Sequence, residues 1–270
     1  MEIEISTVRL VCLGLSGLSV LLMPFVFWFV WRKKAHAPWI PLIIGVIGYL
    51  FIGTIRGVAR ALFLSGMQDT PWTYYILQAV FAGVFEEGGR YLIFRHAIPN
   101  RDNYRDAVSY GIGHGGLESV IIDSGSLLLF YAYIAFVYRT QGMDSLIALG
   151  IPEEQNLAIL QQAADSSLFS SLMIVIYNID SLLLHIALSV LVFTAVHYDN
   201  SRKWFWAAVG LHTFADIIPA FNSTGHTSRI ETDILILLFD LGVFYLTYRV
   251  WEHYRDLSWS DLASPQSDAD

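Results

Sequence analysis

Long runs of apolar residues constrain this chain more than any other feature. Residues 8–31 contain one charged side chain, that of Arg9, and at 1.5 Å per residue they can span a hydrocarbon core of about 30 Å. Comparable runs recur along the chain. The composition agrees, because 15% of the residues are charged, whereas soluble domains carry about 25%. We therefore predict an all-α, polytopic transmembrane helix bundle.

Seven spans are predicted within one transmembrane domain over residues 1–255, followed by a polar tail at 256–270. They are expected at residues 8–31, 39–64, 72–97, 106–138, 169–196, 203–221 and 231–251. The fourth segment is ambiguous, because a single helix of its length would be about 50 Å long. It forms either one long helix or two short spans broken at Asp123–Gly125, which would make eight spans.

The distribution of basic residues predicts the orientation. The cluster 32–34 places the end of the first span in the cytoplasm. If 106–138 crosses once, the loop 140–168, which has four acidic residues and no Lys or Arg, lies outside. We therefore expect the N-terminus outside the cell and the C-terminus in the cytoplasm. The expected location is the plasma membrane of a prokaryote, which the chain crosses several times. Residues 152–164 have helical spacing, and an interfacial helix and a solvated cap both remain open.

Two features exclude other classes of protein. The net charge of −8 argues against a nucleic-acid partner, which would require a basic face. The single cysteine, Cys12, excludes an internal disulfide. The expected partners are membrane lipid and a membrane-embedded peptide or protein.

Ionisable residues inside the predicted spans are the functional candidates, because a charge in a bilayer is costly unless it is paired or hydrated. They are Glu86, Glu87 and Arg90 in 72–97, His114 and Glu118 in 106–138, His185 in 169–196, and His212 and Asp216 in 203–221. Counted from the cytoplasmic span ends at 1.5 Å per residue, Glu86 and the three histidines all lie about 12–17 Å deep. Four spans therefore place polar side chains in one layer.

The spacing of these residues suggests how they pair. His114 with Glu118, and His212 with Asp216, are four residues apart and face the same way, so each carboxylate can fix the tautomer of its histidine. Arg90 can balance the charge of Glu86 or Glu87.

Three further charges inside spans are given less weight. Arg56 and Arg60 are interpreted as side chains that reach the outer interface. Asp240 is left without a role.

Two kinds of chemistry are open to such a cluster. Adjacent carboxylates with histidines can activate a water molecule by general base catalysis. His114, His185, His212 and Glu86 could instead hold a zinc ion with an open coordination position. The HExxH and GxSxG motifs are absent.

Four sequence motifs contain these residues, namely FEEGGRYLIFR at 85–95, SYGIGHGGLES at 109–119, HIALSVLVFTAV at 185–196 and LHTFAD at 211–216. In this order they resemble the YhfC family of intramembrane proteases. That family is similar to the type II CAAX-processing proteases, the PrsW proteases and the APH subunit of gamma-secretase. The EExxxR motif of the CAAX-processing proteases corresponds here to EExxR, which is one residue shorter.

The resemblance implies glutamate-dependent hydrolysis of a membrane-embedded or lipid-linked peptide. It assigns Glu86 or Glu87 as the base, and Glu86 is favoured because Arg90 lies at i+4. It also assigns His114, and His212 with Asp216, to catalysis. Glu118 and His185, which match the YhfC pattern, join Arg90 as supporting residues. Metal dependence stays open, with zinc as the candidate.

Two other functions compete with the peptidase. The APH subunit is a scaffold, so the same fold can serve without catalysis. Buried Glu, His and Asp side chains also relay protons in transporters, although the inverted repeats of many transporters are absent here.

Overall fold

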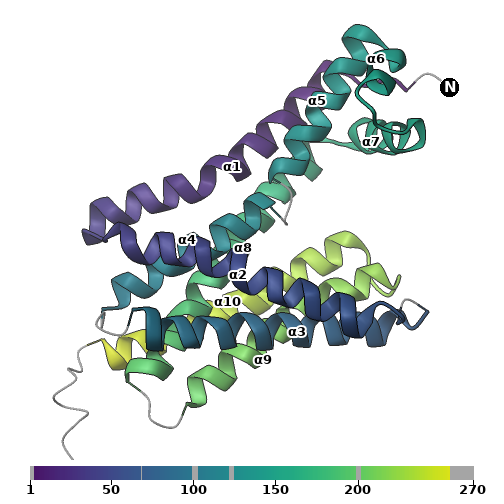
Figure 1. Ribbon diagram of the computed structural model, residues 1–270. Coiled ribbons are helices and arrows are strands. Elements are labelled where there is room, and N and C mark those ends of the chain that lie inside the picture. Colours follow the sequence, from purple (N-terminus) through teal and green to yellow (C-terminus); the bar gives the residue numbers. More distant parts are fainter. Residues whose placement is uncertain (1–2, 68, 99–102, 122–124, 199–201, 256–270) are drawn as a thin grey trace, which may run out of the picture. The chain divides into compact units, whose positions relative to one another are not determined.

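Every regular element of the described part of the chain is helical. The structure is a computed structural model that describes residues 3–67, 69–98, 103–121, 125–198 and 202–255, and no strand occurs in these ranges. Figure 1 labels the helices in chain order. The α-helices in the described ranges are α1 (Thr7–Ala35), α2 (Trp39–Leu64), α3 (Pro71–Leu92), α4 (Tyr104–Ile121), α5 (Gly125–Gln141), α6 (Met143–Ala148), α7 (Glu153–Asp165), α8 (Leu168–His197), α9 (Lys203–Ser223) and α10 (Arg229–Tyr254), and a π-helical segment, η1 (Ile93–Ala97), directly follows α3.

Five stretches of the described residues are long and apolar enough to cross a membrane. They are α1, α2, the stretch Tyr104–Gln141, α8 and α10. The predicted all-α membrane bundle is therefore confirmed. Neither α3 nor α9 belongs to this set, and α3 carries Glu86, Glu87 and Arg90 within its 22 residues. The seven crossings and the orientation of the termini stay predictions.

Helix positions follow the sequence closely, with three differences. The limits of α2 are those predicted, and α8 extends the expected segment 169–196 by one residue at each end. The segment 106–138 contains two helices, α4 and α5; Asp123 and Ser124 lie outside the described residues, so the choice between one span and two stays open. The segment 72–97 changes from α- to π-helix at Ile93, and the loop 140–168 contains α6, which was not predicted.

Local sequence signals explain where several helices begin and end. Pro71 opens α3, where its missing N–H removes no helical hydrogen bond. Ser228 and Glu231 form a capping box at the start of α10. Arg32, Lys33 and Lys34 occupy the last turn of α1, where cations interact favourably with the helix dipole. The α7 helix confirms the helical spacing of residues 152–164.

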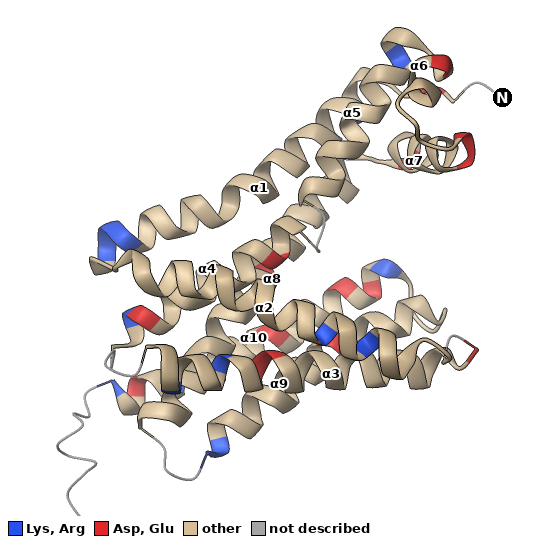
Figure 2. Ribbon diagram, viewed as in Figure 1, with Lys and Arg blue, Asp and Glu red and all other residues tan. Residues whose placement is uncertain are grey.

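Large apolar side chains are exposed along the candidate spans. On α2, Ile47, Phe51 and Leu62 are 59%, 67% and 72% exposed. Figure 2 shows a long stretch of α1 without charge that ends at basic residues, and charged positions inside α2 and α3. An apolar surface of this extent suits contact with lipid and not with water.

The chain divides into two compact units. Unit 1 comprises residues 1–27 and 116–181, and unit 2 comprises residues 28–115 and 182–270. The division falls within α1, α4 and α8. The single domain predicted over residues 1–255 stays a prediction, and the predicted tail at 256–270 lies outside the described residues.

Unit 1 has an apolar core. Its buried residues include Leu13 of α1, Leu128 and Ile134 of α5, Leu146 of α6 and Leu160 of α7. The short helices α6 and α7 are thus held by hydrophobic contacts with α5.

Unit 2 combines an apolar core with buried charge. In this unit α3 packs against α2 and α9, and α9 also packs against α10. The core includes Phe94, Tyr110, Leu188 and Phe193. The close contact between α3 and α9 requires Gly83, because a Cβ there would lie 2.7 Å from the Val209 carbonyl oxygen.

Candidate active site

Helix α3 carries three charged side chains into the interior of unit 2. Glu86, Glu87 and Arg90 have no exposed surface. Burying a charge is costly unless partners compensate it, so the contacts of these three residues indicate what the site is built to do.

Glu86 lies among cationic and imidazole groups from three other helices. Its Oε2 is 3.1 Å from Nε2 of His114 on α4 and 3.9 Å from Nε2 of His212 on α9. Its Oε1 forms an ion pair with Nη1 of Arg56 on α2. One oxygen of the Glu86 carboxylate is therefore directed toward both histidines, while the other oxygen is paired with the Arg56 guanidinium.

Glu87 has a different set of partners. Arg90 Nη1 donates to both of its oxygens, at 2.6 and 2.5 Å, and His212 Nδ1 donates to Oε1 at 2.7 Å. Arg90 also reaches α8, where its Nη2 lies 3.2 Å from His185 Nδ1. Glu87 and Arg90 thus form a buried ion pair that contacts a histidine on each side.

The three histidines are adjacent, as their predicted depths indicated. The ring centroid of His185 lies 5.2 Å from that of His114 and 5.3 Å from that of His212. Their side chains are almost fully buried. Gly115 permits this approach of α4 to α8, because a Cβ at that position would lie 2.6 Å from His185 Cβ.

The two predicted carboxylate partners of the histidines have different environments. Asp216 is 41% exposed, and its Oδ2 is 3.9 Å from His212 Nε2, farther than Glu87 is from Nδ1. Glu118 is buried one helical turn after His114 on α4. The roles assigned to both residues stay predictions.

The predicted position of Arg56 is wrong, and so is the contact of Arg90 that favoured Glu86 as the base. Arg56 was interpreted as a residue of the outer interface, but it contacts Glu86 instead. Arg90 was used to favour Glu86 because it lies at i+4, but it binds Glu87 at i+3. Both spacings place side chains on one helix face, so only the position of Arg56 on a neighbouring helix separates the two pairings. Arg60 is exposed.

The cluster contains the donor atoms that a zinc site needs. One ligand atom from each of Glu86, His114 and His185 lies within 4.8 Å of the others. Zinc binds nitrogen and oxygen at about 2.0–2.1 Å, so the ligands of one ion lie about 3–4 Å apart. The donor types therefore suit a metal ion, and side chains that lie up to 4.8 Å apart would move closer together when they bind it.

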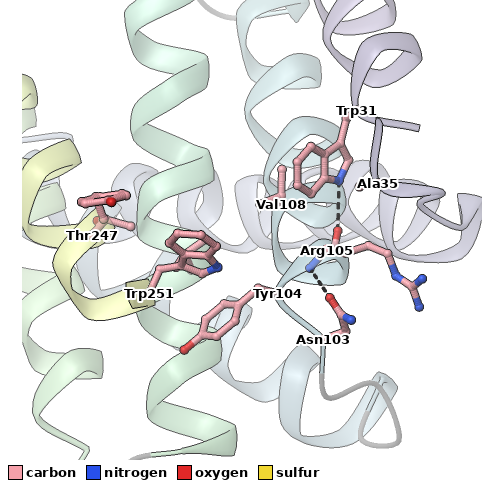
Figure 3. A pocket seen from close by; sticks show the side chains of 10 residues that line it. Trp31, Ala35, Asn103, Tyr104, Arg105, Val108, Thr247 and Trp251 are labelled. Carbon is pink, nitrogen blue, oxygen red and sulfur yellow. Dashed lines mark hydrogen bonds between the residues drawn. The ribbon is translucent and has the colours of Figure 1, made fainter. Parts of the chain in front are cut away.

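A cavity of about 450 Å³ elsewhere in unit 2 has no such chemistry. Figure 3 shows Trp31, Tyr104, Val108 and Trp251 around it, and Trp31 Nε1 donates to the Arg105 carbonyl oxygen at 3.1 Å. No Asp, Glu, His or Cys lines this cavity. The buried cluster, and not this cavity, is the candidate active site.

Comparison with known proteins identifies the family. Residues 18–237 match the model of the family described as YhfC intramembrane metalloprotease. The chain belongs to this family. The matched range includes all the residues of the cluster, and the resemblance found in the sequence motifs is confirmed.

One bacterial membrane protein is similar over almost the whole chain. The chain is 28% identical over 256 residues to the "Uncharacterized membrane protein YhfC" of Bacillus subtilis (strain 168), with 90% of this chain and 96% of the relative covered. No solved structure matches. Membership of the YhfC family makes the chain a multi-pass integral membrane protein. The family is described as intramembrane metalloproteases, and this member contains a buried cluster of Glu and His residues.

Proposed function

We propose that this protein is an intramembrane peptidase that hydrolyses a peptide bond of a membrane-embedded or lipid-linked substrate, with Glu86 as the general base. One observation carries the proposal. A fully buried carboxylate directs one oxygen at two histidine nitrogens from two other helices, at 3.1 and 3.9 Å, while an arginine neutralises the other oxygen. Glu87 is less suited to be the base, because both its oxygens already accept hydrogen bonds from Arg90.

The reaction follows from these positions. Glu86 takes a proton from a water molecule, and the water oxygen bonds to the carbonyl carbon of the substrate. The C–N bond then breaks, and the proton is delivered to the leaving amine by Glu86 or His212. Products are a carboxylate and an amine. His114 orients the water through its contact with Glu86, and apolar helices around the cluster limit the access of bulk water.

A metal ion would be held by residues of this same cluster. Glu86 Oε2 lies 3.1 Å from His114 Nε2 and 3.9 Å from His212 Nε2, so these three residues would supply oxygen and nitrogen donors, and His185 is a further candidate. When bound, zinc acts as a Lewis acid that polarises a carbonyl and favours deprotonation of water. The contact between Glu87 and Nδ1 of His212 has the form of the carboxylate–histidine pairs that orient zinc ligands.

The charges of the cluster support an enzyme over a scaffold. A scaffold needs no buried base directed at two histidines, and the cost of burying these groups would then have no compensating role. A proton relay would use the same residue types, so the two functions are separated by experiment.

The experiment measures cleavage of a transmembrane peptide library in proteoliposomes. Fragments are identified by mass spectrometry for the wild type and Glu86→Gln, which keeps the size of the side chain and removes its basicity. We expect cleavage by the wild type only. Peptide-independent proton flux without any fragments would support the transporter instead, and neither activity would support the scaffold.

A further inference from the structure

The three histidines of the cluster have chemically different partners at Nδ1. The partner is the Glu87 carboxylate for His212, at 2.7 Å, and the Arg90 guanidinium for His185, at 3.2 Å. For His114 it is the phenol of Tyr110, at 3.4 Å. In a neutral imidazole only one ring nitrogen carries a proton, and the partner of Nδ1 determines which.

The first two partners each permit one tautomer. An ionised carboxylate only accepts hydrogen bonds, so Nδ1 of His212 carries a proton, and in the neutral ring Nε2 keeps the lone pair that a cation needs. Nε2 lies 3.9 Å from both Glu86 Oε2 and Asp216 Oδ2, which is beyond hydrogen-bond distance. A guanidinium only donates, so Nδ1 of His185 must accept and its Nε2 carries the proton. The two rings therefore present opposite groups at Nε2.

His114 has a polar partner at each ring nitrogen. Without a cation, the ionised Glu86 carboxylate at 3.1 Å places the proton on Nε2 by the same rule. The phenol of Tyr110 can donate or accept, so it also permits the other tautomer once a cation binds at Nε2. With the proton on Nδ1, the ring donates to Tyr110 and frees the Nε2 lone pair for a cation.

We propose that the Glu87–Arg90 ion pair assigns opposite roles to the two histidines it contacts. His212 presents an acceptor Nε2 that binds metal together with His114 and Glu86. His185 presents an Nε2–H donor to the carbonyl oxygen of the substrate and is not a metal ligand. Arg90 is the positioning residue for His185, and Glu87 is the positioning residue for His212. The catalytic part of this inference rests on the proposed peptidase function.

Zinc affinity provides the first test. The purified protein and the variants His114→Ala, His212→Ala and His185→Ala are titrated with zinc in competition with a chromophoric chelator. His197→Ala serves as the matched control, because His197 is a buried histidine on the same helix as His185 and lies against Phe193 outside the cluster. We expect His114→Ala and His212→Ala to lose more than about 100-fold in affinity. His185→Ala and the control should change it by less than about threefold, since ligand contacts are retained.

Nitrogen NMR provides the second test, and it requires neither metal nor substrate. Protein labelled with ¹⁵N in histidine shows, for each ring, which nitrogen is protonated. We expect a ring protonated at Nε2 only, whose signals disappear in His185→Gln. We also expect that this ring no longer has a fixed tautomer in Arg90→Met, whereas the His212 signals change in Glu87→Gln.

Turnover separates a hydrogen-bond donor from a structural residue. His185→Ala should lower kcat by about 10²–10³-fold with KM little changed, the range for loss of one oxyanion donor. His185→Gln should recover part of the loss, because its amide N–H reaches a position similar to that of Nε2–H.

The outcomes distinguish the inference from the proposed function. If His185→Ala loses zinc as completely as His212→Ala, or if His185 carries its proton on Nδ1, the inference is wrong even when Glu86→Gln is inactive. If the protein neither binds zinc nor cleaves peptides, the peptidase proposal fails, and the NMR spectra still decide whether the ion pair sets opposite tautomers.

Discussion

The two units bury polar side chains in different ways. In unit 1, the amides of Asn156 and Asn178 donate to backbone oxygens four or five residues earlier, those of Ile151 and Ile174. Ser16 likewise donates to the Leu13 oxygen. In unit 2, Glu86 and Glu87 are bonded by side chains from other helices. These neutral groups are satisfied by nearby backbone, whereas the charged cluster draws on five helices, α2, α3, α4, α8 and α9. Unit 1 also buries the carboxylates of Glu118 and Asp180, but the histidine and arginine contacts that point to chemistry lie in unit 2.

The largest expected effect is on catalysis. Glu86→Gln should reduce turnover by about 10²–10⁴-fold, since a general base contributes this much. Cleavage of transmembrane peptides in proteoliposomes measures it. Asp240→Asn is the matched control, because it removes the same charge from a buried acid of α10 outside the cluster. Equal losses of turnover in both variants would mean that any buried acid is required for activity. The distinction between the cluster and the rest of the buried polar residues would then be wrong.

Removing the partner of a buried charge should cost stability. Arg90→Met leaves the Glu87 carboxylate without its cation, and we expect a loss of about 3–5 kcal/mol in the free energy of unfolding. Denaturant titration in mixed micelles measures this. The double variant Arg90→Met with Glu87→Gln should recover much of the loss. A double variant no more stable than Arg90→Met would show that the ion pair is not what compensates Glu87.

A smaller effect is expected on metal binding. Glu87→Gln keeps the shape of the partner of His212 but removes its charge, and we expect zinc affinity to fall by about 10–100-fold. Competition with a chelator measures the affinity. Unchanged affinity would contradict the orienting role of Glu87. The far-ultraviolet circular dichroism spectrum should be unchanged, as a control for folding.

The smallest effect is expected in unit 1. Asn178→Ala removes a hydrogen bond within α8, and even hydrogen bonds between membrane helices contribute only about 0.6 kcal/mol on average. Unfolding should show a loss of about that size, with turnover per folded molecule unchanged. A loss of turnover comparable to that of Glu86→Gln would remove the distinction between the two units.

The sequence predicted the helices better than the pairing of charges. Apolar runs of span length fix a helix such as α2 almost to the residue, because no other element satisfies the backbone in lipid. Depths counted at 1.5 Å per residue also predicted that Glu86 and the three histidines lie in one layer, because the rise of a helix is nearly constant over such distances.

The ion pair between Glu86 and Arg56 could not be predicted from the apolar runs or from depth. These residues are 30 positions apart on different helices, and their contact depends on how α2 is rotated against α3. No periodicity within one helix contains that information. The pairing of Arg90 with Glu87 then follows, because Glu86 already has a cation. The π-helical segment after α3 likewise had no signal in the apolar pattern.

The most direct test of the central claim, hydrolysis by water that Glu86 activates, is isotope incorporation. Proteoliposomes containing the wild type or Glu86→Gln are incubated with the transmembrane peptide library in H₂¹⁸O, and the fragments are analysed by mass spectrometry. The account predicts wild-type fragments with ¹⁸O in the new C-terminal carboxylate, and none from Glu86→Gln. Equal fragment yields from the two proteins, or wild-type fragments without ¹⁸O, would contradict it.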